Sequence, residues 1–428
     1  MVSRGRMRFN SVFISTYTFI YNGSHTNNSG PVIPLRDFFN KRAKTVYLLE
    51  QPLPGSDFHD TVLTVFREAK ESERVTKNFF FSRTPAQRVD SNKTYIRLKL
   101  RDIFSNFYFF FKNYRAFRTQ KVDLFIGLES INALCGVIMK KAGLVDKVVY
   151  YIFDWAPDRY SNPVLNRIYI WLDKMATYHS DSTWNITYTI GEARKNILRF
   201  DEGRMSPQLY VPYCVNFDEG NILPDDRVDP NLIVYSGGLI EENGPYLLLE
   251  AYRLVMDRHP ESRLLIIGGG GVEGKLREYI KEHGMENNVE ITGYIASEKK
   301  VMELQCRGAI GVAPYPVMKG SRKPFGDVIK IRMYFACGLV TVSTPVPPVS
   351  KEIAEEKLGY RTANDSPEGI AVGICMFLKD KKVLFEYRRN VIRKARLSNW
   401  ENNYSNALSK MNMSVVPESM FPVGQSAP

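Results

Sequence analysis

A cation-rich loop between an apolar strand and a short helical segment is the part of the chain best suited to bind an anion. An apolar run ends in Val312-Ala-Pro-Tyr-Pro316, and Lys319, Arg322, Lys323 and Lys330 follow it. Ammonium and guanidinium groups donate charge-assisted hydrogen bonds to phosphate, each worth roughly 1.5–3 kcal/mol when desolvated. We therefore expect this loop to bind an anion such as a diphosphate. In the same loop, Asp327 would either accept hydrogen bonds from sugar hydroxyls or pair with a neighbouring cation.

Glycines follow two apolar strands of the same half. Gly237 and Gly238 follow the strand 232–235 and precede a helix. A backbone without Cβ atoms can approach a phosphate closely at a helix N-terminus, although a simple tight turn would also use glycine. A second run begins at Gly268, and Gly269, Gly271 and Gly274 match the dinucleotide spacing formally. It follows the second strand of its half rather than the first, so we expect no dinucleotide cofactor.

Polar residues also follow strands in the first half. His25 lies in the first loop, Glu129 follows the strand 122–126, and Asp154 follows the strand 147–153, with Arg159 next to it. Ligands of open α/β sheets bind beyond the carboxyl ends of the strands. Asp154 therefore suits acceptor binding or proton transfer, or it caps the next turn. His25 is either part of the same site or a satisfied loop residue.

Apolar strands alternate with helices along the chain, which is typical of parallel sheets covered on both faces. We expect strands at 9–21, 45–49, 122–126, 147–153, 183–190, 232–235, 263–267, 289–292 and 309–313. An acidic segment with two prolines, 217–231, predicts a linker. The expected domains are therefore 1–216 and 232–390, followed by a helical region at 391–412 and a disordered tail at 413–428. Two such sheets facing each other would place the anion site in the cleft between the domains.

The composition is that of a soluble globular protein, with 44% hydrophobic and 24% charged residues. The net charge of +12 indicates an acidic partner, and no nucleic-acid recognition motif accompanies it. The five scattered cysteines predict reduced core thiols, and we expect no metal site. Because the first apolar run is broken by polar residues, we expect neither a signal peptide nor a membrane-spanning helix. The expected location is the cytoplasm.

Residues 96–121 combine cations with aromatic rings. Seven basic residues stand against one acid, and eight residues are aromatic. Such a segment can lie on an anionic membrane surface. It can also be a core helix with solvated basic ends, and the sequence leaves both interpretations open.

The second half resembles the donor-binding domain of retaining glycosyltransferases of family four. The matching segments are Val234-Tyr-Ser-Gly-Gly-Leu239, Leu248-Leu-Glu-Ala-Tyr252, His259-Pro-x-x-Arg-Leu-Leu-Ile-Ile-Gly268, Val289-x-Ile-Thr-Gly-Tyr294, Ala313-Pro-Tyr-Pro316 and Lys330-Ile-x-x-Tyr-x-Ala-Cys-Gly338. Trp400 matches the closing tryptophan of that family. The likeness covers about 232–404, and the first half is weaker but consistent.

The resemblance implies the GT-B fold, with two Rossmann-like domains whose parallel sheets face across a cleft. It implies that 1–216 binds the acceptor, that 232–390 binds a nucleotide-sugar and that 391–412 crosses back to the first domain. It also implies sugar transfer with retention and without a cofactor or an essential metal. We expect a glycan or lipid-linked acceptor at the inner membrane face, as in cell-surface glycan biosynthesis.

The resemblance and the strand-end positions together assign the site residues. We assign Asp154 and Lys330 to catalysis, Gly237, Gly238, Gly270, Tyr294, Arg322, Lys323, Asp327 and Lys330 to the donor, and His25, Glu129 and Arg159 to the acceptor side. Gly237 and Gly238 would face the diphosphate, Tyr294 would lie near the base and Lys330 would contact phosphate.

Several residues depart from the family pattern. Gly238 and Asn243 stand in place of its Arg and Lys, Phe325 and Met333 in place of its paired Glu, and Phe153 in place of its His. A thioether such as that of Met333 cannot accept the hydrogen bonds that a carboxylate would. A non-catalytic relative that acts as a partner subunit or scaffold is therefore the alternative to an enzyme.

Overall fold

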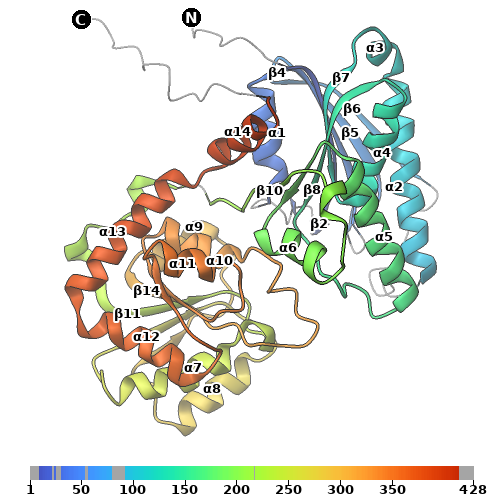
Figure 1. Cartoon of the computed structure of the whole chain (residues 1–428). Coiled ribbons are helices and arrows are strands. Elements are labelled where there is room, and N and C mark those ends of the chain that lie inside the picture. The colour runs from blue at the N-terminus through green and yellow to red at the C-terminus, as the bar shows by residue number, and fades with distance from the viewer. Residues whose placement is uncertain are drawn as a thin grey trace, which may run out of the picture. The chain divides into compact units, whose positions relative to one another are not determined.

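The computed structural model describes residues 9–21, 24–25, 30–53, 56–79, 92–215 and 217–413, which form two compact units (Figure 1). Unit 1 comprises Met1–Pro212 and Trp400–Pro428, and unit 2 comprises Tyr213–Asn399. The expected linker at 217–231 thus belongs to unit 2. The chain returns to unit 1 at Trp400 rather than at residue 391. All but the first residue of the expected tail, 413–428, lies outside the described residues.

Unit 1 contains an eight-stranded sheet in the order β10-β9-β8-β7-β1-β4-β5-β6. The strands from β10 to β4 are parallel, whereas β5 and β6 pair antiparallel at one edge. The bounds are β1 Phe9–Thr18, β4 Ala43–Pro52, β5 Thr61–Arg67, β6 Lys70–Lys77, β7 Val122–Leu128, β8 Val145–Ile152, β9 Ser182–Asn185 and β10 Gln208–Tyr210. A separate two-stranded ribbon joins β2 Ile20–Tyr21 and β3 Ser24–His25.

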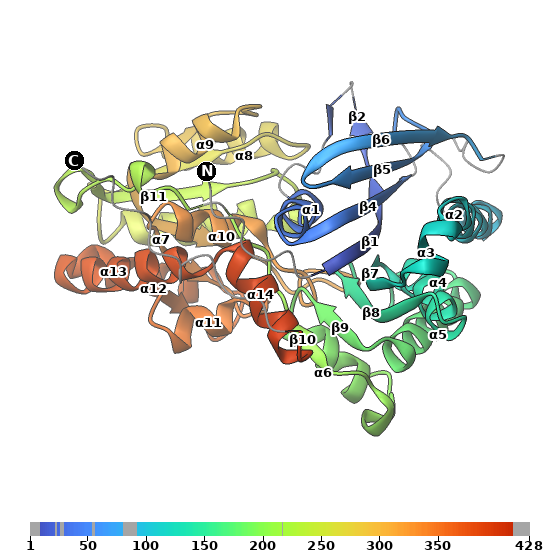
Figure 2. The ribbon, with the colours of Figure 1, turned by 90° about the horizontal axis from the view of Figure 1, so that it is seen from above.

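Helices cover both faces of this sheet (Figures 1 and 2). One face carries α2 Asn92–Lys112, α3 Tyr114–Thr119, α4 Ser130–Lys141, α5 Pro163–His179 and α6 Tyr188–Asn196, and the other carries α1 Val32–Asn40 and α14 Trp400–Lys410. The predicted strand 183–190 was wrong in its second part, since Tyr188 already begins α6. Ile190 is fully buried there, so packing overrides the strand preference of these residues.

The last helix of unit 1 packs on the first. Tyr404 of α14 is fully buried, and its hydroxyl donates a 3.0 Å hydrogen bond to the Pro31 carbonyl oxygen. Its ring meets the Phe38 ring of α1 edge-on, with centroids 5.4 Å apart. Glu401 forms an ion pair with Arg42 just after α1. The C-terminal segment is therefore part of the core of unit 1.

The core-helix interpretation of 96–121 holds for one side of α2, and contact with a membrane stays a prediction. Phe109 and Phe110 are fully buried and pack with Phe13 and Phe125 of the sheet. Phe104 and Phe111, on the opposite side of α2, are more than half exposed. The segment is thus a core helix with an uncovered apolar outer side.

Unit 2 contains a six-stranded sheet in the order β13-β12-β11-β14-β15-β16, in which every pairing is parallel. The strands are β11 Asp229–Ser236, β12 Arg263–Ile267, β13 Val289–Ile291, β14 Gly308–Ala313, β15 Val340–Ser343 and β16 Gly359–Arg361. The helices are α7 Pro245–Met256, α8 Glu273–Glu282, α9 Glu298–Gln305, α10 Ile329–Ala336, α11 Ser350–Glu355, α12 Pro367–Lys379 and α13 Lys381–Leu397.

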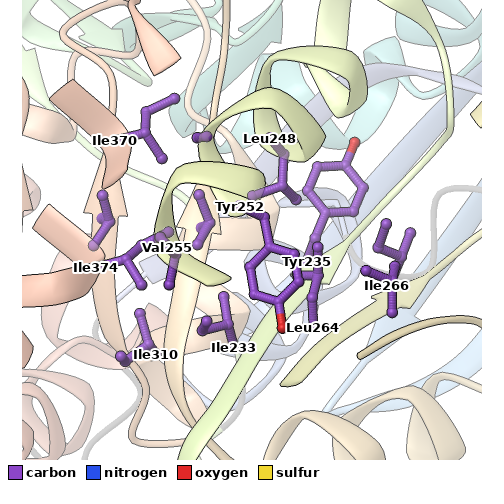
Figure 3. Close-up of a cluster of buried hydrophobic side chains, with 14 of the residues drawn as sticks. Ile233, Tyr235, Leu248, Tyr252, Val255, Leu264, Ile266, Ile310, Ile370 and Ile374 are labelled. Carbon is purple, nitrogen blue, oxygen red and sulfur yellow. The ribbon is translucent and has the colours of Figure 1, made fainter. Parts of the chain in front are cut away.

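The core of unit 2 shows why its strands form. Successive side chains of a strand point to opposite faces. Ile233 and Tyr235 therefore pack under α7 and α12 (Figure 3), whereas Leu232 and Val234 pack on the other face with α9 and α10. Both faces are covered, which explains the continuous apolar runs 232–235, 264–267 and 309–313 that precede polar or glycine-rich loops.

The described residues also bear on the cysteines and on membrane-spanning helices. All five cysteines are buried and none forms a disulfide bond, as expected of reduced core thiols. Among the described residues, no helix is long and apolar enough to cross a membrane.

Candidate functional site

A cavity of about 840 Å³ lies at the carboxyl end of the sheet of unit 2. Its walls are the loop after β11, the 3-10 turn Glu241–Asn243, and the loop 314–328 that joins β14 to α10. The charged side chains that line it are Lys319, Arg322, Lys323, Lys330, Glu242 and Asp327. The structure therefore brings the predicted cations together at one strand-end pocket.

Lys330 is the buried cation of this cavity. It lies in the first turn of α10, is 8% exposed, and its Nζ has no hydrogen-bond partner among the described residues. The nearest rings are those of Tyr235 and Tyr315, whose centroids lie 4.1 and 4.9 Å from Nζ. Burial lowers the pKa of Lys330 well below its ordinary value, and Lys323 lowers it further. An ammonium buried without an acceptor is costly, so this arrangement favours an anion supplied from outside the chain.

Gly237 holds open the space beside Lys330. Its φ of +142° is one that residues with side chains rarely adopt, and a Cβ there would lie 3.1 Å from the Lys330 Nζ. The Gly238 carbonyl oxygen, by contrast, accepts hydrogen bonds from the Tyr235 hydroxyl at 3.2 Å and from Asn243 Nδ2 at 2.9 Å. The two glycines thus form a tight turn that also leaves the ammonium accessible.

Lys323 and Glu242 form a second charged group in the cavity wall. Burial lowers the pKa of Lys323, and the nearby Glu242 carboxylate opposes that shift. Glu242 accepts a 2.7 Å hydrogen bond from the Ser321 hydroxyl, which ties the turn after β11 to the cationic loop. The sequence analysis missed Glu242, although its place directly after the strand-end glycines was a usable signal.

Asp327 forms an ion pair with a neighbouring cation, which is one of the two expectations for it. Its buried carboxylate is 3.2 Å from the Arg332 guanidinium and accepts a 2.9 Å hydrogen bond from the Tyr213 backbone N–H. Burial raises the pKa of Asp327, and Arg332 opposes this. These contacts hold the loop in place, and a contact between Asp327 and sugar hydroxyls stays a prediction.

Gly270 and Tyr294 do not line this cavity. A Cβ at Gly270 would lie 2.4 Å from the Leu239 carbonyl oxygen, so glycine is needed there for backbone packing. Tyr294 lies beside Gly269, and its side chain is 81% exposed. A contact between Tyr294 and a base stays a prediction.

Unit 1 brings Glu129, Asp154 and Arg159 together at the carboxyl ends of β7 and β8. The Arg159 guanidinium donates a 2.8 Å hydrogen bond to Asp154 Oδ2. Burial raises the pKa of Glu129, whereas Arg159 and Lys99 lower it. Glu129 has φ +73° and ψ +159°, a backbone region almost reserved for glycine. This strain at a strand end supports a functional role for the cluster.

A network beside Glu129 was not predicted, because its members come from distant segments. Tyr17 of β1 donates a 2.8 Å hydrogen bond to Asp102 of α2 and accepts one of 2.9 Å from Lys99 Nζ. Asp102 is also paired with Arg101 at 2.6 Å. His25 contributes backbone to β3, and its side chain lies outside the description.

Residues 224–398 match the family described as Glycosyl transferases group 1. The match lies within unit 2 and spans most of it. The chain is also 33% identical, over 73 residues, to an uncharacterized glycosyltransferase of Methanocaldococcus jannaschii. That match spans only 17% of either chain.

Solved structures resemble the whole chain. The crystal structure of Anabaena HepE in complex with UDP is 13% identical, with a TM-score of 0.59 over 94% of this chain and 99% of that one. Sucrose-phosphate synthase of Thermosynechococcus elongatus is 12% identical, with a TM-score of 0.59 over 94% and 98%. WaaG, a glycosyltransferase involved in lipopolysaccharide biosynthesis, is 14% identical, with a TM-score of 0.54 over 94% and 99%. The fold is GT-B, as expected.

The structure places three of the residues that depart from the family pattern. Asn243, in place of the usual Lys, is buried and holds the Gly238 carbonyl. Phe325 and Met333, in place of the usual Glu pair, are half-buried and do not line the cavity. Of the cations that line the cavity, Lys330 matches the family pattern, whereas Gly238 and Asn243 stand where the family has Arg and Lys.

Proposed function

We propose that this protein transfers a sugar from a nucleotide-sugar to a glycan or lipid-linked acceptor, with retention at the anomeric carbon and without an essential metal. The observation that carries the proposal is the Lys330 ammonium, which is buried and lacks a hydrogen-bond partner beside a glycine that leaves it open. A diphosphate oxygen is the acceptor that such a group requires.

The cations of the cavity suit the chemistry of the leaving group. When the bond between the sugar and the diphosphate breaks, negative charge grows on the phosphate oxygen. A preorganised ammonium in a desolvated site stabilises that charge more than water does. We assign this role to Lys330, with Lys323 as a second contact. HepE is solved in complex with UDP, which makes UDP the first nucleotide to test.

The acceptor side is proposed to be the cluster of Glu129, Asp154 and Arg159. The Asp154 side chain is 43% exposed and is oriented by Arg159. A carboxylate held in this way can bind an acceptor hydroxyl and take its proton. A lipid-linked acceptor would place the protein at the cytoplasmic membrane face.

The alternative is a non-catalytic relative that binds a nucleotide or a partner without transfer. Two observations favour it, since Phe325 and Met333 provide no carboxylate and Asp327 is held by Arg332. Detectable sugar transfer that Lys330→Ala abolishes would exclude it.

Isothermal titration calorimetry with UDP, GDP and ADP and with their sugar conjugates tests the donor assignment. We expect one nucleotide to bind at a single site and Lys330→Ala to weaken it by about tenfold or more, from the loss of one charge-assisted hydrogen bond. Lys275→Ala, on α8 outside the cavity, is the control and should leave the affinity unchanged. Absence of binding by every nucleotide-sugar would refute the proposal.

A further inference from the structure

The outer side of α2 carries a continuous apolar stripe. Its exposed residues recur at helical spacing and are Ile96, Leu100, Phe104, Tyr108, Phe111 and, at the start of α3, Tyr114. Residues three or four apart lie on one side of a helix, so these side chains form a single strip. Phe104 is 56% exposed and Phe111 is 52% exposed. Exposed apolar patches of this extent mark interaction sites.

The stripe is hollowed rather than flat. Phe104, Phe107, Tyr108 and Phe111 line a groove of about 480 Å³ together with Lys112. The opposite side of α2 is fixed to the protein, because Asn106 donates a 2.8 Å hydrogen bond to Asn132 of α4. The helix therefore presents its aromatic side from a rigid support.

Cations accompany the stripe along α2 and α3. Arg97, Lys112, Arg115 and Arg118 are exposed, whereas the single acid among the described residues of these two helices, Asp102, is buried and paired with Arg101. Within the described part of the chain, no carboxylate forms an ion pair with Arg115 or Arg118. Lys112 lies 3.8 Å from a Glu73 carboxylate oxygen, so Arg97, Arg115 and Arg118 supply the positive charge beside the aromatic rings.

We propose that the α2–α3 surface, defined by this stripe and these cations, binds the interface of a bilayer that contains anionic lipids. Amphipathic aromatic rings settle at the depth of the headgroups, and lysine and arginine beside them pair with lipid phosphates. A second copy of the chain fits less well, because it would bring two cationic surfaces together. The proposal concerns docking and is independent of the nucleotide chemistry of unit 2.

Vesicle flotation tests the proposal with the full chain. The probes are vesicles of phosphatidylcholine alone and of phosphatidylcholine with about a third phosphatidylglycerol. We expect the wild type to float with the anionic vesicles and to be released by salt, because surface charges are screened within about 10 Å at 0.1 M ionic strength. Arg115→Gln with Arg118→Gln should weaken partitioning by roughly thirtyfold, at about 1 kcal/mol per cation.

Phe104→Gln with Phe111→Gln removes the aromatic contribution and should lower partitioning at least tenfold. Matched controls make the same chemical changes elsewhere: Ile197→Gln with Val372→Gln replaces exposed apolar residues, and Lys382→Gln with Arg389→Gln removes exposed cations. Circular dichroism and UDP calorimetry confirm that each variant is folded, and all should retain any nucleotide affinity of the wild type.

Three results would overturn the proposal. The first is a wild type that does not float with anionic vesicles at low salt. The second is a loss of partitioning in the controls that equals the loss in the α2–α3 variants. The third is a dimer in sedimentation analysis that Phe104→Gln with Phe111→Gln dissociates, since the stripe would then be a protein interface. A failure of nucleotide binding alone would leave the vesicle results unaffected.

Discussion

Replacing Lys330 by Met should have opposite effects on stability and on nucleotide binding. Met keeps most of the apolar stem of the side chain and removes the ammonium. The Lys330 Nζ is buried without a hydrogen-bond partner, which costs roughly 1–3 kcal/mol. Its contacts with the Tyr235 and Tyr315 rings, at 4.1 and 4.9 Å, offset about 1 kcal/mol of that cost. We expect Lys330→Met to raise the free energy of unfolding of unit 2 by about 1 kcal/mol without ligand.

The same substitution should weaken UDP binding. One charge-assisted hydrogen bond is worth roughly 1.5–3 kcal/mol, so the dissociation constant should rise by about ten- to 150-fold. Calorimetry measures this change. Lys319→Met is the matched control, because Lys319 lies in the same loop but is exposed. It should weaken binding less and leave stability unchanged.

The stability measurement needs a probe placed in unit 2. All four tryptophans, Trp155, Trp171, Trp184 and Trp400, lie in unit 1, so tryptophan fluorescence does not follow unit 2. Hydrogen exchange of the β11 and β14 amides in increasing urea follows the unfolding of unit 2. A Lys330→Met protein that is no more stable than the wild type and binds UDP equally well would refute the reasoning.

Four further outcomes follow from the buried charges and the backbone. The pKa of Lys330 is lowered in the folded protein. Between that lowered pKa and the ordinary lysine pKa, the unfolded chain binds one proton more than the folded chain. The free energy of unfolding of the ligand-free protein should therefore rise with pH in this range. UDP would restore the charge, so binding in that window should take up a proton, seen as a buffer-dependent enthalpy in calorimetry. Asp327→Asn should lower the free energy of unfolding of unit 2 by about 3 kcal/mol, because Arg332 would keep only Glu352; a change confined to sugar preference would contradict this. Glu129→Gly should raise the free energy of unfolding of unit 1 by about 1 kcal/mol, because glycine relieves the strained φ, whereas Glu129→Ala should not. Urea unfolding followed by tryptophan fluorescence measures this change. Equal effects of the two variants would argue against backbone strain.

The parallel sheets and the cationic pocket were accessible from the sequence because their signals are local. Apolar strands such as 232–235 are buried on both faces, and the loops after them carry the polar residues. Lys330 and Gly237 could therefore be placed at one edge of a sheet. Only the structure shows that a Cβ at Gly237 would crowd the Lys330 ammonium.

The antiparallel edge and the ion pairs were not accessible in the same way. β6 is exposed and charged, as suits an edge strand that must avoid further pairing, and so it lacks an apolar pattern. Several cations lie close to Asp327 in the sequence, and which of them pairs with it depends on side-chain packing rather than on sequence spacing. The network of Tyr17, Lys99 and Asp102 joins segments that are far apart in the chain, and no local pattern predicts it.

The docking of α14 on α1 constrains the order in which the protein can be built. Unit 2 is one continuous stretch of chain, whereas unit 1 needs Tyr404 to complete its core. During synthesis, unit 2 therefore emerges whole from the ribosome before unit 1 can be finished. The uncovered side of α1 must be kept from aggregation during that interval. A nascent chain that stalls before residue 400 would carry a complete unit 2, with its cationic cavity, attached to an unfinished unit 1.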